Sequence, residues 1–288
     1  MRRICVLALL CVTCSLAVLW PAPFVGPIAP RPHQSLQTIL QHAFPMLWQN
    51  ASAGMLMGVQ GGSGATGFTP AYISSGTCVT GSNTCTITLS VAAGNFAVCG
   101  VLSTSVPTNT LTCTDANTDS FSYPSSSPYL STGLAIMRPG FALMSATASE
   151  VFTCHVTNGA NYFTCSVLVF SGTPTSGWDV ALAGATGSPL ACPCTNTPVN
   201  SGTTAATSVA NELSIGLMGT GAAPSDFAFT GTGGYSFPAA GQIRYSTAMY
   251  IALGYKALTS IGTQQATSGA NTSYTISPTP FGAVSTIK

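Results

Sequence analysis

Charged residues are scarce in this sequence. The 288 residues include 7 Lys and Arg and 6 Asp and Glu, which leaves a formal net charge of +1 at pH 7. Proteins that bind nucleic acids or acidic polymers neutralise them with many Lys and Arg contacts. The composition therefore excludes nucleic acid as the expected partner.

Familiar catalytic motifs are missing as well. The sequence has no G-x-S-x-G elbow, no H-E-x-x-H zinc helix and no phosphate-binding G-x-x-x-x-G-K. Six acidic residues could in principle supply a glycosidase pair, but their spacing selects none. His155, the histidine of the β-rich region, alternates onto the outer face of its predicted strand. We therefore predict that the protein is not an enzyme.

The N-terminus, residues 1–22, reads as a secretory signal. Arg2 and Arg3 precede an apolar run that ends at Pro21, the order typical of signal peptides. An uncleaved membrane anchor is the alternative, because the run is close to the length that spans a bilayer. Both interpretations place the remainder outside the cytoplasm, as a secreted, cell-surface or periplasmic protein.

Residues 23–54 are expected to form a proline-rich spacer followed by a short helix. Proline is too frequent between Pro21 and Pro32 for helix or sheet. The helix is predicted to begin after Ser35 and to end at Pro45. Its apolar positions fall at helical spacing: Leu36, Ile39, Leu40, Ala43 and Leu47.

From residue 55 to 288 the pattern predicts an all-β fold, an antiparallel β-sandwich of the jelly-roll or immunoglobulin-like type, as a single domain. Short apolar stretches alternate with clusters of Gly, Ser, Thr, Asn and Pro. Residues 84–91 alternate strictly and predict a half-buried strand with a hydroxyl-rich outer face. Residues 152–156 and 163–169 repeat the pattern and are predicted to face one core. Asn158-Gly159 between them favours a tight hairpin turn.

Eight cysteines follow the signal region, and an even number in an exported chain indicates disulfides. Cys78 and Cys85 flank a plausible hairpin loop at Gly81-Ser82, and Cys99 with Cys113 is a second expected bridge. Cys154 and Cys165 would face each other across a Gly159-Ala160 loop, but not across Asn158-Gly159.

Cys192 and Cys194 are separated by one proline. A bridge between cysteines two positions apart is strained and should be easier to reduce. The pair is therefore either a redox-active or metal-binding pair, or a structural one, bonded to each other or to other cysteines.

One acidic cluster could bind calcium weakly. Asp115, Asn117 and Asp119 place side-chain oxygens at every second position, as at the start of a calcium loop. Ser120 stands where the turn glycine is needed, and Ser126 where the bidentate Glu is needed, so a complete EF-hand is excluded. Turns rich in Asp and Asn have the same appearance. Calcium is the one cofactor that the sequence suggests.

Aromatic residues next to polar ones offer a platform for neutral sugars. Trp178, beside Asp179, is the best candidate, and Tyr129, Tyr235 and Tyr245 are alternatives. The alternative role of each is packing in the core or at a sheet edge.

Four segments resemble a group of exported bacterial β-sandwich proteins of unknown function. They are Ala93 to Val101 (AGNFAVCGV), Cys113 to Phe121 (CTDANTDSF), Val167 to Gly172 (VLVFSG) and Ala210 to Gly216 (ANELSIG). The resemblance covers roughly residues 55–288 and implies no activity. Asp119 stands where the group usually has Asn, and Val169 where many members have an acidic residue.

Two classes of function agree with these features. The first is an exported, non-catalytic structural or adhesive surface protein, whose partner is another protein surface or further copies of itself through unpaired edge strands. The second is a carbohydrate-binding module that recognises neutral glycans.

Overall fold

The computed structural model describes residues 68–104, 109–131, 135–158, 162–275 and 277–288. All belong to one compact unit, Gly64–Lys288. The predicted signal segment, spacer and short helix lie outside the described residues. No helix in the described ranges has the length and apolarity needed to cross a membrane.

The first half of this unit forms two antiparallel sheets. The first inner sheet has five strands in the order β1-β8-β3-β6-β5, and the first outer sheet has three in the order β2-β7-β4. The strands are β1 (Ala71–Thr80), β2 (Thr84–Val91), β3 (Phe96–Thr104), β4 (Leu111–Asp115), β5 (Tyr129–Ser131), β6 (Ala135–Leu143), β7 (Ala148–Val156) and β8 (Phe163–Ser171).

The second half forms another such pair. The second inner sheet has the order β13-β14-β11-β16-β9, and the second outer sheet the order β10-β15-β12. The strands are β9 (Ala183–Thr186), β10 (Cys194–Ala206), β11 (Leu213–Gly221), β12 (Ala228–Gly231), β13 (Gln242–Tyr245), β14 (Met249–Ala257), β15 (Thr263–Thr272) and β16 (Pro280–Ile287), with a 3-10 helix, η2 (Ala239–Gly241), before β13.

The two halves have the same topology. Read from its other edge, the second inner sheet is β9-β16-β11-β14-β13. The number of each strand is therefore eight higher than that of the strand in the same position of the first inner sheet. The outer sheets match in the same way, because β10-β15-β12 corresponds to β2-β7-β4. The chain therefore builds one strand arrangement twice, the first sandwich before about residue 171 and the second after it.

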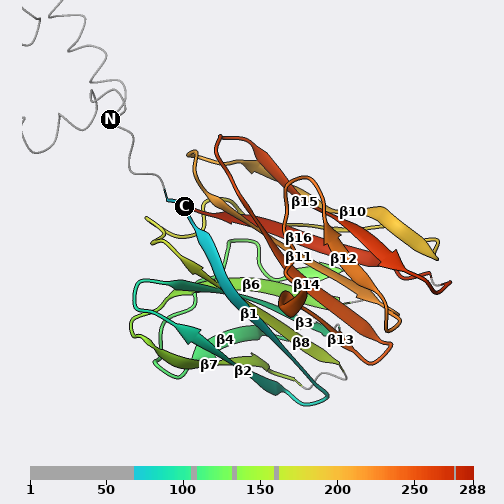
Figure 1. Ribbon diagram of the computed structural model, residues 1–288, viewed down its shortest axis with the longest axis horizontal. Coiled ribbons are helices and arrows are strands. Elements are labelled where there is room, and N and C mark those ends of the chain that lie inside the picture. The colour runs from blue at the N-terminus through green and yellow to red at the C-terminus, as the bar shows by residue number, and fades with distance from the viewer. Residues whose placement is uncertain (1–67, 105–108, 132–134, 159–161, 276) are drawn as a thin grey trace, which may run out of the picture. The chain divides into compact units, whose positions relative to one another are not determined.

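The four sheets stack as layers, with one apolar core between each neighbouring pair. Side chains of the first inner and first outer sheets share one core, and those of the second inner and second outer sheets share another. A third, central core lies between the two inner sheets. Figure 1 shows the blue-to-green sandwich below the yellow-to-red one. The sequence predicts one sandwich over residues 55–288; the strands form two sandwiches joined by a shared core.

Central packing buries the middle strands of the inner sheets on both faces. Strands β3, β8 and β11 are buried at every residue except the last, and β16 at every residue. The sequence predicts that residues 163–169 form a half-buried strand. That prediction is wrong for the face expected to be in water, because the second sandwich covers this face. Two polar side chains on that strand find partners inside. Ser166 Oγ donates to Gly241 O at 2.9 Å, and Thr164 Oγ1 contacts Leu102 O at 3.5 Å.

The half-buried strands predicted over residues 84–91 and 152–156 are confirmed, and both belong to the first outer sheet. Strand β2 has the expected limits, with Cys85, Ile87 and Val91 buried and its threonines exposed. In β7, Phe152, Cys154 and Val156 are buried while Thr153 and His155 lie on the outer side. Strands β7 and β8 contribute to one core, as expected.

Three disulfides cross the first sandwich. They are Cys78–Cys85, Cys99–Cys113 and Cys154–Cys165. The first two are the pairs expected from the sequence, and the third is the pairing that the sequence leaves dependent on the loop. The expected hairpins are wrong, because β1 and β2 belong to different sheets, and so do β7 and β8. The bridges instead tie each of the three outer strands to a strand of the inner sheet. Multiple disulfides are typical of an oxidising, non-cytoplasmic environment.

We expect the double variant Cys154→Ala/Cys165→Ala to lower the free energy of unfolding by about 2–4 kcal/mol, because the lost bridge closes a loop in the unfolded chain. Chemical denaturation at neutral pH measures this. Cys192→Ala/Cys194→Ala is the matched control, since its bridge spans a sequence separation of only 2 rather than 11. Equal losses in the two variants would contradict the cross-linking role.

Gly100 of β3 sets how closely the inner sheets approach. A Cβ atom added there would lie 2.7 Å from Leu217 Cδ1 and 3.1 Å from Leu253 Cδ1, both on the second inner sheet. Gly100→Val should therefore cost about 1–3 kcal/mol of stability by overpacking the central core. Gly262→Val is the control, because a Cβ atom at Gly262 would meet only Gln264 Nε2, at a relaxed 4.0 Å. A Gly100→Val protein that unfolds at the same denaturant concentration as the wild type would refute this account.

Candidate functional site

Trp178, the leading sugar-platform candidate, is built into the junction between the sandwiches. Its ring packs edge-on against Phe141, with 5.4 Å between ring centroids, and contributes to the central core. The indole Nε1 donates to Ser122 O at 3.1 Å, and the backbone bridges to Ile287 of β16. Both the ring and the indole N–H of this half-buried side chain are thus engaged by other residues of the fold.

Asp179 is held in an internal ion pair. Its carboxylate lies 2.7 Å from Lys288 Nζ and accepts the Ser208 N–H at 2.6 Å. Burial alone would raise the pKa of Asp179, but the hydrogen bonds from Lys288 and Ser208 lower it to about 2. The carboxylate is therefore ionised at neutral pH and already paired.

Ser208 and Lys288 form the arrangement that most resembles a nucleophile and base. Ser208 Oγ lies 3.0 Å from Lys288 Nζ. A serine–lysine pair needs a neutral lysine to take the hydroxyl proton. The hydrogen bond to Asp179 raises the pKa of Lys288 above its usual value, so the amine stays protonated. This pair therefore acts as a structural brace.

The three candidate tyrosines are spread over different parts of the fold. Tyr129 packs over Gly184, and its hydroxyl lies 3.0 Å from Thr186 Oγ1. Tyr235 is only 4% exposed. Tyr245 is half-buried and pairs with Tyr162, with ring centroids 5.0 Å apart. The structure does not gather the predicted sugar-binding residues into one site.

The acidic loop that follows β4 is braced from within. Asp115 Oδ1 accepts the Asp119 N–H at 2.7 Å, and Asp119 Oδ2 accepts the Ser145 N–H at 3.0 Å. Asp115 and Asp119 line a shallow groove beside β4, together with Phe121, Tyr123 and neighbouring residues. Asn117 is absent from this lining, because its side chain turns toward Glu150.

Glu150 is a buried carboxylate that the sequence analysis did not single out. It is 1% exposed, and its Oε1 accepts the backbone N–H groups of Ala116 and Asn117 at 2.7 and 3.2 Å. The strand alternation carried a signal for it, since Glu150 shares the inward face of β7 with Phe152. Glu150 thus anchors the acidic loop to the outer sheet.

The remaining acidic residues hold loops in the same way. Glu212, fully buried, accepts the Val209 N–H at 3.3 Å. Burial, together with the charge of Asp179, raises the pKa of Glu212. Asp226 accepts Thr272 Oγ1 at 2.7 Å and also binds Ser273.

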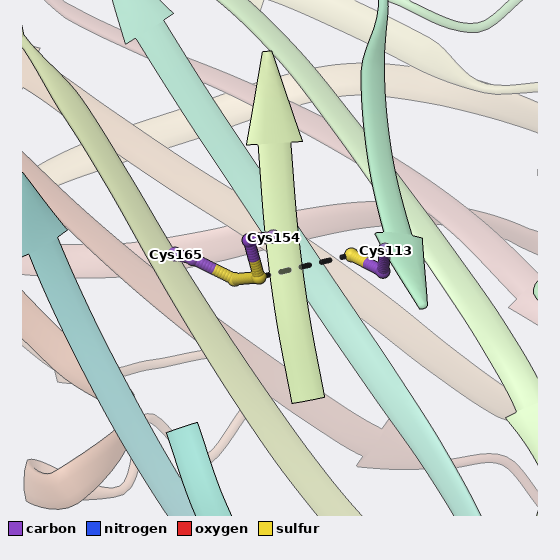
Figure 2. A group of neighbouring side chains, drawn as sticks. All are labelled: Cys113, Cys154 and Cys165. Atoms are coloured by element: carbon purple, nitrogen blue, oxygen red, sulfur yellow. Dashed lines mark hydrogen bonds between the residues drawn. A yellow bond between two sulfur atoms is a disulfide. The ribbon is translucent and has the colours of Figure 1, made fainter. Parts of the chain in front are cut away.

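Three cysteine sulfurs form the tightest cluster of metal-ligand types among the described residues. The Sγ atoms of Cys113, Cys154 and Cys165 lie within 4.8 Å of one another. Figure 2 shows the Cys154–Cys165 bridge with Cys113 beside it, at 4.0 Å from Cys154 Sγ. Metal binding needs thiolates, and here all three sulfurs belong to disulfides.

Cys192 and Cys194 are bonded to each other. Both are buried, at 6% and 9% exposure, in the core of the second sandwich. Of the structural alternatives expected for this pair, the structure therefore contains the mutual bridge.

Comparisons with protein families, with characterised proteins and with solved structures find no match to this chain. Functional inference therefore rests on the residues and their geometry.

Asp115 generates a pH dependence of stability. Oδ2 of this residue is buried without a hydrogen-bond partner, and burial, with the charges of Asp119 and Glu150, raises the pKa to about 6 from 3.8. Because the folded pKa is the higher one, the stability that Asp115 contributes is complete below pH 4 and is lost as the pH rises to about 6.

We therefore expect Asp115→Asn to be more stable than the wild type at pH 7.5, by on the order of 1–3 kcal/mol, and equally stable at pH 4. Denaturant unfolding at both pH values measures this. Asp226→Asn is the control, and it should lower the stability at pH 7.5 instead of raising it. Hydrogen bonds from Ser273 and Thr272 lower the pKa of Asp226 to about 2, so its ionised form stabilises the fold. An Asp115→Asn variant that is less stable at both pH values would disprove the assignment.

Proposed function

We propose that this protein is an exported, non-catalytic structural or adhesive component of a cell surface or extracellular material. One observation carries the proposal: all six acidic side chains accept hydrogen bonds that brace loops or strand ends. Acid–base catalysis needs a carboxyl group that is free to reach a substrate, and each of these groups is already held by at least one hydrogen bond within the fold.

The Lys and Arg side chains in the described part of the chain are engaged in a similar way. Arg138 donates to Leu111 O at 2.8 Å and lies over the ring of Tyr123, and Arg244 contacts Ala223 O at 3.5 Å. Lys256 faces the ring of Tyr235. The surface therefore offers little charge for recognising an ionic substrate, which favours a contact surface made of neutral groups.

The architecture supports an extracellular role. We infer that each sandwich is a jelly roll, because its first strand pairs with its last in the inner sheet and its second with its seventh in the outer sheet. The first of them is crossed by three disulfides, which suits a protein that persists outside the cell. The resemblance to exported bacterial β-sandwich proteins agrees with this proposal.

Neutral-glycan binding is the second candidate, and one aromatic pair favours it. Tyr162 is 36% exposed and lies against Tyr245, so two adjacent rings reach the surface. Paired tyrosines with some exposed ring area are the kind of group that neutral sugars contact. Among the predicted platform residues, Tyr245 is the one with an exposed aromatic neighbour.

Adhesion of the oxidised full-length protein to polysaccharide-coated and protein-coated surfaces tests the proposal. We expect retention that changes less than twofold between 50 mM and 500 mM salt, because no charged patch drives it. Release of soluble sugars or peptides from the coating would show an enzyme instead. A steep loss of retention with salt would also overturn the proposal.

The glycan alternative predicts that Tyr162→Ala weakens retention on polysaccharide at least fivefold without changing the melting temperature. Tyr274→Ala is the matched control, because Tyr274 is the more exposed tyrosine, at 57%. Equal retention of both variants would remove the aromatic pair as a sugar site, while leaving adhesion to protein surfaces as the remaining function.

A further inference from the structure

The first outer sheet repeats one tripeptide pattern on all three of its strands. Residues 84–86 of β2 and 112–114 of β4 read Thr-Cys-Thr, and residues 153–155 of β7 read Thr-Cys-His. In each strand the cysteine is buried and its two neighbours lie on the outer side. The pattern therefore presents two outward polar side chains for each inward sulfur.

Strand register aligns these tripeptides side by side. Thr153 is paired with Thr86 on one side and with Thr114 on the other, which makes one row across the sheet. His155 is paired with Thr84 and with Thr112, which makes a second row. Neighbours in a row are about 4.8 Å apart, and the rows about 6.8 Å apart. We define these six residues as the threonine grid.

The grid is continued by neutral residues along β2 and β7. Thr88 stands opposite Val151, and Ser90 opposite Ser149. No Lys, Arg, Asp, Glu, Phe, Tyr or Trp belongs to this face of the described strands. No hydrogen bond joins a hydroxyl of the grid to another described residue. Thr84, Thr86 and Thr114 are exposed, and the other members of the grid are half-buried.

Disulfides hold the grid rigid from behind. The cysteine between each pair of outward side chains, Cys85, Cys113 or Cys154, is bonded to the inner sheet. Pairing within the sheet is regular throughout. The second outer sheet differs, because the pairing of β10 with β15 shifts at three places. Its outer face cannot form a regular array, although it is also neutral.

We propose that the threonine grid binds the surface of ice. A hydroxyl group donates one hydrogen bond and accepts two, much as water does, so water ordered on the grid can join a crystal lattice. Charged side chains would instead hold water in shells of their own. A rigid, regular array loses little conformational entropy when it meets a flat solid. Sugar polymers fit the grid less well, because it has no aromatic ring for them to contact.

Inhibition of ice recrystallisation by the oxidised full-length protein tests this, with the change in freezing point as a second measure. We expect growth of ice grains to slow at micromolar protein. Thr153→Tyr, at the centre of the grid, should raise the concentration that halves grain growth at least tenfold. Thr153→Val should raise it less, because valine keeps a methyl group and the size of the threonine side chain.

Thr263→Tyr is the matched control, since Thr263 is an exposed residue on the central strand of the second outer sheet. It should keep full activity, and the melting temperatures of all variants are measured alongside. If Thr153→Tyr lowers the melting temperature, Thr86→Tyr at the exposed edge strand replaces it. Ice growth unaffected by the wild-type protein, or inhibition that survives both tyrosine variants, overturns the proposal. Retention on an insoluble polysaccharide that only the grid variants lose, without an effect on ice, would assign the face to glycans instead.

Discussion

Face-to-face packing of the two inner sheets is the constraint on which the rest of the structure depends. Antiparallel sheets commonly leave one face in water, but these two are covered on both sides, by an outer sheet and by each other. An ionised side chain in such a layer would be buried without water and would need a partner. This constraint explains the lack of charge in the inner sheets, while the exposed faces of the first outer sheet are neutral as well.

The two sandwiches fill equivalent cores with different chemistry. The first places six half-cystines between its sheets, whereas the second packs aromatic rings, including Phe227, Phe229 and Tyr250, whose centroids lie 5.1 to 5.8 Å apart. Disulfides fix the separation and register of strands, while rings fill volume. One outer face is a regular array rich in threonine, and the other includes a strand with shifted pairing. The same topology thus supports two unlike surfaces.

Sequence pattern located the outer layer better than it located a site. Strict alternation fixed β2 from Thr84 to Val91, because one face of that strand is in water. The same alternation predicted a half-buried strand for β8 and was wrong there, because the hydroxyl side chains of Thr164 and Ser166 are buried under the second sandwich. Trp178 illustrates the same limit. Beside Asp179 it has the appearance of a sugar platform, yet its indole N–H reaches Ser122, 56 positions away in sequence, and no local pattern contains that contact.

By itself, the sequence determined the all-β class and the absence of local catalytic motifs, since these depend on composition and short-range periodicity. It also named the Cys78–Cys85 and Cys99–Cys113 pairs, although β1 and β2 do not form the hairpin assumed for the first of them. The tertiary structure alone decided the duplicated topology, the four layers and the use of every carboxylate as a brace. It also aligned three Thr-Cys-Thr/His tripeptides from distant segments into one grid. These features arise from pairing between residues far apart in the chain, and such pairing is set by the packing of whole sheets rather than by the residues next to each strand.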